Sequence, residues 1–261
     1  MKMTKNFSGF MLTPIYILLA CAFIFSWNET AAQEKVQVYG NIDFNKALPE
    51  RINDYLRLES EMWKPVQEEH IRQGGIIDWN VFRVWFAGTG AEYNYAVMET
   101  YRNYSDMAFV YSDDIITKVL PGVNEAKLME DTYRAREIVR AQSVERIATV
   151  EPAAKKPFQY AVVTFLAVKK DNEAAFENYV RDLIVKSFNE RMQNGLDLGW
   201  DLYKMILPNG ETMPCQYISF EYLDNMDQAA KTSWPGPLQG VKPCTVYRTE
   251  LWERLVYLPA E

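Results

Sequence analysis

The sequence has little of what most catalytic and metal sites are built from. It has one histidine and three cysteines among 261 residues. A single histidine cannot supply a site made of several imidazoles, so we expect no metal site. The chain also lacks a glycine-rich phosphate loop, a GxSxG elbow, an HExxH pair and paired CxxC motifs. The net charge of −7 comes with no basic run, which argues against nucleic-acid binding.

What is present is the composition of a globular protein. Hydrophobic residues make up 48% and charged residues 24%, which excludes a disordered chain. Aromatic residues make up 14% and are typical of strands and well-filled cores. The length suits one large domain or two of ordinary size.

The first 32 residues have the pattern of a secretory signal peptide. Lys2 and Lys5 precede an uncharged apolar stretch, and the small residues Thr30 and Ala32 form the exit. We therefore expect cleavage after Ala32 and a secreted or periplasmic protein with no membrane attachment after cleavage.

Two other interpretations of this segment stay open. One is an uncleaved anchor helix, against which Pro14 and the short apolar core argue. The other is a lipoprotein with Cys21 as its lipidated residue, against which the apolar residues that follow argue. After cleavage only Cys215 and Cys244 would remain, either bridged or as two separate thiols.

The chain repeats one pattern twice. Residues 55–83 form an amphipathic helix pattern, a glycine stop and a strand that opens on tryptophan, and residues 179–204 repeat it. The matching pairs lie 121 residues apart: Glu69 with Glu190, Gly74 with Gly195, Trp79 with Trp200, and Arg83 with Lys204. A repeat of this length indicates duplicated domains.

Each predicted unit has the order β-α-β-β-α-β. In the first unit, residues 33–150, we expect strands at 36–44, 76–86, 92–102 and 140–151, with helical segments at 48–73 and 105–137. A proline-containing linker, 151–157, leads to the second unit, residues 158–261. There we expect strands at 158–169, 196–207, 213–223 and 246–258, a helix at 172–194 and a short segment at 225–240.

This order predicts an α+β fold. Each unit would form a ferredoxin-like antiparallel sheet with both helices on one face. The other face is apolar and is expected to pack on the sister sheet. Val97 is expected on that shared face, with the helix side as the alternative.

The arrangement resembles the dimeric α/β-barrel superfamily in a tandem-duplicated form. That superfamily includes antibiotic-biosynthesis-monooxygenase-like, stress-responsive barrel and chlorite-dismutase-like proteins. The resemblance covers residues 36–258 and is one of pattern and topology, since no catalytic motif of any member matches. It implies two ferredoxin-like units packed sheet to sheet as a pseudo-dimeric α/β barrel.

Four residues are candidates for ligand binding: His70, Trp79, Arg83 and Glu99. His70 ends the buried stripe of the first helix, where it could act as an acid or base or as an axial haem ligand. The alternative is a histidine held at the helix end by the dipole, and the repeat favours it by placing Arg191 there.

The other candidates have structural alternatives too. Trp79 and its repeat Trp200 are most simply core residues between helix and sheet, with stacking on a ligand as the alternative. Arg83/Lys204, Glu99/Glu221 and Arg146/Arg254 recur in both units and could line a cavity or form cross-strand ion pairs.

Our leading functional hypothesis is an exported, non-catalytic protein that binds a small, largely apolar or aromatic ligand or a protein partner. The alternative is a cofactor-independent monooxygenase-like or haem-binding enzyme that uses the first unit's helix–sheet pocket. We expect no cofactor under the first hypothesis and haem under one form of the second, and a homo-oligomer is compatible with both. Any ligand is expected in the first unit, which keeps His70 and has 13 more residues before its last strand.

Overall fold

The computed structural model describes residues 37–108, 113–151, 157–208, 214–231 and 244–259. The expected signal segment and cleavage site lie outside these residues. Among the described residues, no helix combines the length and apolar character needed to cross a membrane. Residues 37–261 make up one compact unit, and the account that follows concerns this unit.

Eight strands close into a barrel in the order β1-β3-β2-β8-β5-β7-β6-β4, and every neighbouring pair is antiparallel. The strands are β1 (Tyr39–Ala47), β2 (Asp78–Val84), β3 (Tyr95–Tyr101), β4 (Arg136–Val150), β5 (Tyr160–Val168), β6 (Gly199–Leu207), β7 (Tyr217–Leu223) and β8 (Cys244–Pro259).

The barrel consists of two ferredoxin-like sheets joined at their edges. The first unit supplies β4-β1-β3-β2 and the second supplies β8-β5-β7-β6. The long last strands β4 and β8 make the junctions, because β4 pairs with β1 and β6 while β8 pairs with β5 and β2. Among the described strands, closure leaves no sheet edge unpaired. The predicted α+β fold of two tandem units is therefore confirmed.

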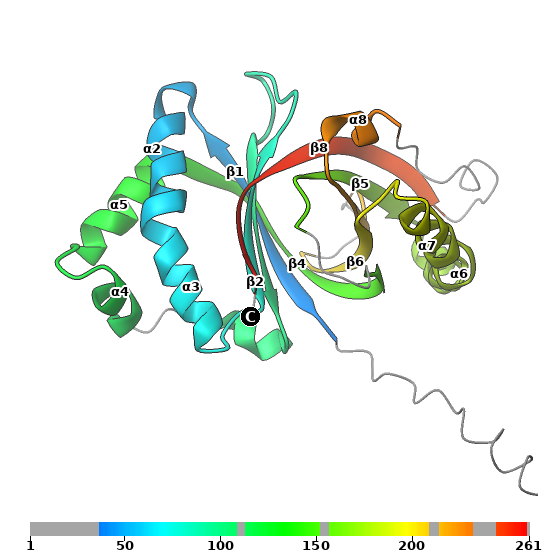
Figure 1. Cartoon of the computed structure of the whole chain (residues 1–261), viewed down its shortest axis with the longest axis horizontal. Helices are drawn as coiled ribbons and strands as arrows, with labels where there is room; N and C mark the ends of the chain where they lie inside the picture. The colour runs from blue at the N-terminus through cyan, green and yellow to red at the C-terminus, as the bar shows by residue number, and fades with distance from the viewer. Residues whose placement is uncertain (1–36, 109–112, 152–156, 209–213, 232–243, 260–261) are drawn as a thin grey trace, which may run out of the picture. The chain divides into compact units, whose positions relative to one another are not determined.

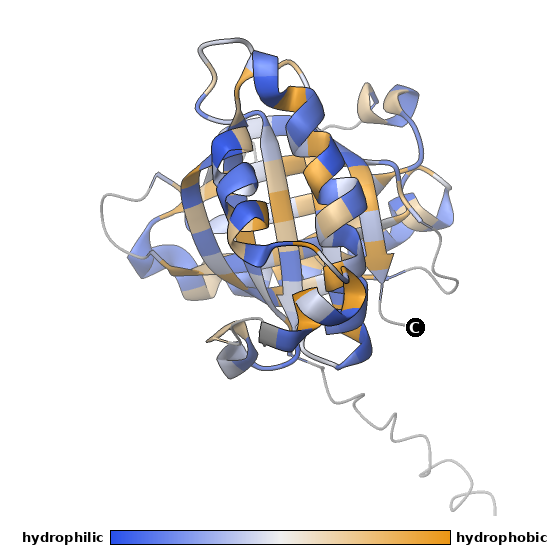
Figure 2. Ribbon diagram, turned by 90° about the vertical axis from the view of Figure 1, so that its left-hand side faces the viewer, coloured by the Kyte–Doolittle hydropathy of each residue, from blue (hydrophilic) through white to orange (hydrophobic). Residues whose placement is uncertain are grey.

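Helices cover the barrel on two sides. The first unit contributes α2 (Ile52–Arg57), α3 (Lys64–Arg72), α4 (Asp113–Val119) and α5 (Glu125–Ala135), and the second contributes α6 (Glu173–Tyr179) and α7 (Val185–Gln193). Figure 1 shows the two groups on opposite sides of the strands. Viewed from the first unit's side, α2 and α3 lie in front of the sheet and carry mixed polar and apolar surfaces (Figure 2). A last short helix, α8 (Met226–Ala229), follows β7.

The two expected long helices each contain a π turn. In the first unit η1 (Pro49–Arg51) and α2 lead into the π turn η2 (Leu58–Trp63), which continues as α3. In the second unit η4 (Lys170–Asn172) and α6 lead into the π turn η5 (Val180–Ile184) and then α7. Both π turns fall at matching repeat positions, so the duplication preserved a local feature that often marks functional sites.

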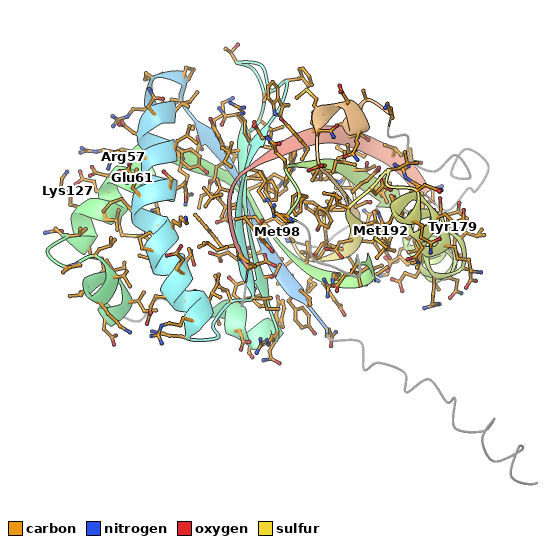
Figure 3. The ribbon with its side chains drawn as sticks, in the orientation of Figure 1. Arg57, Glu61, Met98, Lys127, Tyr179 and Met192 are labelled. Carbon is orange, nitrogen blue, oxygen red and sulfur yellow. The ribbon has the colours of Figure 1, made fainter. Side chains whose placement is uncertain are left out.

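Alternation along the strands separates two layers of core. One cluster fills the barrel and includes Ile42, Phe44, Met98 and Phe220. Met98 points into this space, whereas Arg57, Glu61 and Lys127 project from the outer side of the first helix layer (Figure 3). Two further clusters lie between each sheet and its own helices.

The expected position of Val97 on the shared inner face is wrong. Val97 packs in the helix–sheet cluster of the first unit, and its neighbours Ala96 and Met98 face the barrel. Successive side chains point to opposite faces of a strand, so a strand that is apolar on both faces does not reveal which set points inward.

The two cysteines are free thiols on different faces of the sheet. Cys215 is buried in the barrel cluster, while Cys244 packs against the helix–sheet cluster of the second unit. Between the two alternatives left open by the sequence, the described structure has two separate thiols.

Candidate functional site

A group of charged side chains lies under the first unit's helices, in an otherwise apolar layer. Asp43 comes from β1, Glu99 from β3, Glu59 from the π turn η2, and Arg136 is the first residue of β4. We call these four residues the carboxylate cluster. Odd-numbered residues of β1 and β3 face the helices, so both strand carboxylates point toward η2 and α3.

Arg136 is the positive charge of the carboxylate cluster. Its Nε lies 3.5 Å from Oε1 of Glu59, and its Nη1 donates a hydrogen bond of 2.9 Å to Oδ1 of Asn45. Glu59 is only 3% exposed, so this ion pair lies in the interior of the protein. One guanidinium serves three carboxyl groups, which leaves the cluster short of positive charge.

The two strand carboxylates have their own donors. Glu99 accepts hydrogen bonds from Nε2 of Gln67 at 3.0 Å and from the Tyr101 hydroxyl at 2.5 Å. Asp43 accepts one from Nδ2 of Asn41 at 2.9 Å. These bonds fix the carboxylates on the sheet, whereas Glu59 approaches from the helix side.

Burial raises the pKa of all three carboxyl groups. The pKa of Glu59 rises from its ordinary 4.5 to about 7, because burial outweighs the opposing effect of Arg136 and the Glu99 charge adds to the rise. Burial is also the main cause of the raised pKa of Asp43 and of Glu99. A carboxyl group with a pKa near 7 can take up and release a proton at neutral pH.

Some polar atoms of this region remain unsatisfied. Oε1 of Glu59 and Nε of Arg136 are buried, and although they lie 3.5 Å apart neither has a well-formed hydrogen bond within the described part of the chain. Buried polar groups are normally paired, so such atoms are where a bound molecule or water would form bonds. Within the described ranges, no group of three or more His, Cys, Asp or Glu residues could hold a metal ion.

The matching positions of the second unit do not form a comparable cluster. There Thr164 replaces Asp43, Val180 replaces Glu59, and Cys244 replaces Arg136. The position of Gln67 is taken by Phe188, which stacks on Trp200 with ring centroids 4.7 Å apart. The second helix–sheet layer is therefore apolar where the first carries charge.

Solvent also reaches the first unit's layer at positions that are buried in the second. Asp43 and Glu99 are only partly buried, although they lie on β1 and β3 beneath the helices. Their counterparts Thr164 and Glu221 are buried, each 3% exposed. The first layer is therefore less tightly closed over these two positions than the second.

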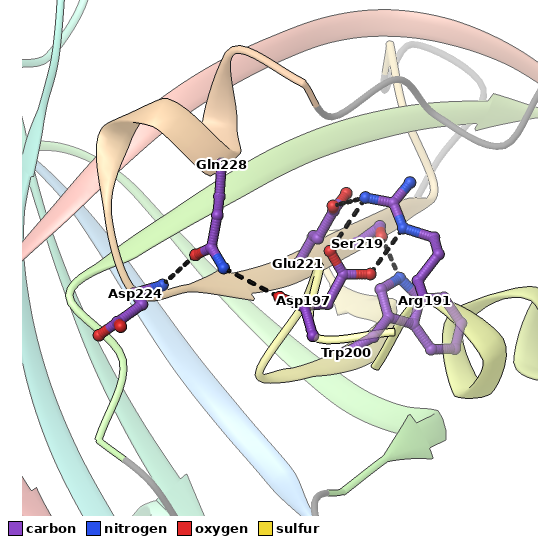
Figure 4. Close-up of polar contacts among 8 residues, drawn as sticks. Arg191, Asp197, Trp200, Ser219, Glu221, Asp224 and Gln228 are labelled. Atoms are coloured by element: carbon purple, nitrogen blue, oxygen red, sulfur yellow. Dashed lines mark hydrogen bonds and ion pairs between the residues drawn. The ribbon is translucent and has the colours of Figure 1, made fainter. Parts of the chain in front are cut away.

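The second unit closes its layer with an ion-pair network instead. Nε of Arg191 donates to Oδ2 of Asp197 at 2.6 Å, and the same guanidinium donates to Glu221 (Figure 4). Trp200 donates from Nε1 to the Ser219 hydroxyl at 2.7 Å. Burial, with the Asp197 charge, raises the pKa of Glu221, and Arg191 opposes this rise. Arg191 matches His70 in the repeat, so the two halves fill this helix end differently.

Trp79 and Glu99, two of the predicted site residues, are brought together. They are directly opposite each other on β2 and β3. Arg83 is not part of this group. It pairs with Glu253 on the neighbouring strand, with Nε 2.9 Å from Oε2, and lies over the Trp85 ring. Arg83 therefore has the cross-strand ion pair that was its structural alternative.

His70 is packed tightly at the end of α3. It is 3% exposed, and burial lowers its pKa. Its ring lies against the α-carbon of Gly75, so close that a Cβ added there would sit 2.2 Å from Nε2. An axial haem ligand needs open space beside its ring nitrogen, and a ring that is 3% exposed and packed against Gly75 leaves little room for a macrocycle. The residues around His70 do not fit haem.

Sequence analysis missed Asp43, Glu59, Gln67 and Arg136. A detectable pattern was present, because each is polar in the first copy and is replaced in the second by an apolar residue or, for Asp43, by an uncharged one. Comparing the copies position by position along the whole repeat would have found them.

Comparison with known proteins adds a result about the fold. No protein-family model matches the sequence, and no curated protein is significantly similar to it. Two solved structures named "putative monooxygenase" do match. The protein from Lactobacillus acidophilus NCFM has a TM-score of 0.55 at 12% identity, over 87% of this chain and 97% of that one. The protein from Fusobacterium nucleatum has a TM-score of 0.56 at 13% identity, over 86% and 94% of the two chains.

A heme-binding protein from Thermus thermophilus is less similar, with a TM-score of 0.49 at 9% identity over 84% of this chain and 91% of that one. At such low identities only the fold follows. The fold of the first two structures extends over almost their whole length and most of this chain.

Proposed function

We propose that this chain, which has the dimeric α/β-barrel fold in its tandem form, is an enzyme that abstracts a proton from its substrate. A small, largely apolar substrate would bind at the carboxylate cluster, with Glu59 as the general base. The observation that carries this proposal is the pKa of about 7 at Glu59, caused by burial in the first unit's helix–sheet layer. Buried carboxyl groups whose pKa is raised beside a specific charge partner are concentrated at catalytic sites.

Glu59 and Arg136 of the carboxylate cluster, with Tyr55 beside them, have separate tasks. Glu59 accepts the proton from an acidic C–H or O–H of the substrate. Arg136, which donates to Asn45 and lies beside Glu59, stabilises the negative charge that develops on the substrate. The buried Tyr55 hydroxyl lies beside Glu59 and stabilises its carboxylate form, the form that accepts the proton.

The surrounding layer is suited to an apolar substrate. Tyr55 and Tyr95 pack with their ring centroids 4.7 Å apart, and Trp79 and Val81 lie on the same face of β2. Gln67 and Tyr101 hold Glu99 in place next to Trp79. Excluding water from this layer keeps Glu59 basic and strengthens the effect of Arg136.

The finer form of the proposal is monooxygenation without a cofactor. Removing a proton from a methylene group that is conjugated through aromatic rings to a carbonyl gives a carbanion that reacts directly with O2. The methylene becomes a carbonyl and the second oxygen atom leaves as water, so no external reductant is required. Two proteins of this fold that are named "putative monooxygenase" support this form.

The sequence favoured an exported, non-catalytic binding protein, with an enzyme as the alternative. We now prefer the enzyme, in its cofactor-independent form, and retain a small apolar substrate. Export by the N-terminal segment remains a separate proposal, as does self-association.

Anthrone is a suitable test substrate, because its methylene is acidic and its product, anthraquinone, is measured by absorbance. The wild type should consume one O2 per anthrone, and Glu59→Gln should reduce the rate at least 100-fold. Glu61→Gln is the matched control, since Glu61 belongs to the same π turn but is exposed on the outer side (Figure 3). Equal rates for the two variants would contradict the role of Glu59.

A further inference from the structure

A cavity lies at one end of the barrel, on the inner side of the sheet. It has a volume of about 310 Å³ and is lined by the residues of the β2–β3 hairpin and by the start of β8. Trp85, Phe86, Tyr93, Arg248 and Glu250 are among the lining residues. We call it the barrel-mouth cavity. The carboxylate cluster lies on the other face of the sheet, under the helices.

Charged and amide side chains enter the barrel near this cavity from two strands. Arg140 and Gln142 of β4 lie opposite Phe44 and Ile42 of β1, which belong to the barrel cluster. In the repeat, 108 residues later, Arg248 and Glu250 of β8 take the same places. Two arginines therefore meet within an apolar barrel.

Both guanidinium groups lie over aromatic rings. Arg140 is 4.2 Å from the centroid of Phe44 and 5.5 Å from that of Tyr93. Arg248 is 5.2 Å from the centroid of Tyr93 and 4.8 Å from that of Phe165. The Tyr93 ring is thus within reach of both cations, and these contacts hold the guanidinium groups in fixed orientations.

The two arginines differ in how well they are satisfied. Nε of Arg248 lies 3.0 Å from Oε1 of Glu250, and its Nη2 donates to the Tyr93 hydroxyl at 2.5 Å. Tyr93 in turn donates to Glu250 at 2.8 Å. The charge of Arg248 is thus neutralised by Glu250, although its Nε forms the ion pair without a well-formed hydrogen bond in the described part of the chain.

Arg140 and Gln142 lack comparable partners among the described residues. The ion pair of Arg140 with Glu92 spans 3.6 Å, and its Nε and Nη2 are buried with no hydrogen-bond partner in the described part of the chain. Gln142 is 1% exposed, and neither its amide oxygen nor its amide nitrogen has a partner there. Buried polar atoms without hydrogen bonds lower the stability of the fold. Those of Arg140 and Gln142 would do so in a protein that binds nothing at this place.

Phe86 gives the cavity an aromatic rim. It is 85% exposed and has a φ of 61°, a conformation that is rare for a bulky residue. The preceding residue is held in place, because the Trp85 amide donates to the Leu251 carbonyl at 2.8 Å. Strain of this kind is concentrated at ligand sites, where the rest of the structure imposes it.

We infer that the barrel-mouth cavity binds a small aromatic carboxylate. The ring occupies the cavity beside Phe86, and the carboxylate reaches past the cavity wall to form a charge-assisted pair with Arg140 and to take the amide hydrogen of Gln142. Arg140 does not line the cavity itself but lies behind Glu92 and Tyr93, both of which line it, and Gln142 lies two residues further along β4. A volume of about 310 Å³ lies within the range of small-molecule sites. This inference does not depend on the proposed reaction.

Benzoate and its neutral isostere benzamide are the probes, with binding measured by calorimetry on the full-length protein. Wild type should bind benzoate at least tenfold more tightly than benzamide. Arg140→Met should remove that preference, and Arg140→Lys should restore part of it. Arg134→Gln is the control, because Arg134 is an exposed residue of α5 that pairs with Glu130.

Gln142→Leu separates a ligand role from a structural one. Replacing an unpaired buried amide by an apolar side chain of similar shape should raise the melting temperature of the ligand-free protein while weakening benzoate binding at least threefold. A lower melting temperature with unchanged binding would overturn the inference. So would failure of the wild type to bind benzoate, equal affinities for the two probes, or full benzoate preference in Arg140→Met.

Discussion

Glu59 and Val180 occupy the same position in the two halves of the chain, 121 residues apart, each in the π turn of its covering helix. Both are buried, at 3% and 2% exposure. One therefore places an ionisable group in the interior and the other an apolar side chain, at the same place in the repeated fold. Val180 therefore shows which kind of side chain this position holds when it serves folding alone.

The first prediction concerns stability and pH. The folded-state pKa of Glu59 is raised from 4.5 to about 7, so between these values the folded state holds a proton that the unfolded chain has released. Stability is then lost as pH rises from 4.5 to 7, and Glu59 contributes up to about 3 kcal/mol to this loss. The free energy of unfolding, measured with urea at pH 5 and at pH 7.5, should therefore fall less in Glu59→Gln than in the wild type. The difference should be about that amount.

The same comparison in Glu61→Gln should leave the pH dependence unchanged, because Glu61 is exposed. Identical slopes for wild type and Glu59→Gln would show that Glu59 titrates normally.

The second prediction concerns Arg191. Removing it leaves Asp197 and Glu221 buried without their positive charge, so Arg191→Ala should destabilise the protein by about 3 kcal/mol. Activity per folded molecule should stay unchanged, because the carboxylate cluster lies in the other unit. Arg181→Ala, an exposed position in the same unit, is the control for stability. If folded Arg191→Ala lost activity, the functional site would lie in the second unit and not in the first.

The third prediction concerns Gly75 and His70. A methyl group at residue 75 would overlap the buried His70 ring, so Gly75→Ala should cost about 1–3 kcal/mol. Adding His70→Ala should recover part of this loss, a coupling that a double-mutant cycle measures. Gly88→Ala is the control, since a Cβ there meets no atom of the described structure within 4 Å. Additive effects would mean that His70 does not pack on Gly75.

The fourth prediction concerns processing. Exported protein should begin at Gln33, because the small-x-small pattern ends at Ala32. N-terminal sequencing after expression in a Gram-negative host checks it. A mature chain that begins at Cys21, or one that retains Met1, would contradict the signal-peptide interpretation.

The order of elements could be predicted from the sequence because periodicity and glycine stops are local properties. The segments around Trp79 and Trp200 are strands in the expected places, and Pro121 and Gly122 do separate α4 from α5. The inner and outer faces could not be assigned, as Val97 and Met98 show. Both are apolar, and only the closed barrel determines which one faces inward.

The candidate site was predicted only in part. Glu99 and Trp79 were identified because they recur in both halves, whereas His70 and Arg83 attracted attention as rare or charged residues. Glu59 and Arg136 lie 77 residues apart in the sequence, and only folding brings them within 3.5 Å. The pKa of Glu59 depends on burial, which no local pattern reports.

The central claim is that Glu59 removes a proton from a bound substrate, and hydrogen exchange tests it without involving oxygen. Anthrone is incubated with enzyme in D2O under nitrogen, and deuterium entering its methylene group is followed by NMR. Wild type and Glu61→Gln should catalyse the exchange, with a rate that rises with pH through a midpoint of about 7, the pKa of Glu59. Glu59→Gln should show only the background rate. Exchange by Glu59→Gln at the wild-type rate would contradict the claim.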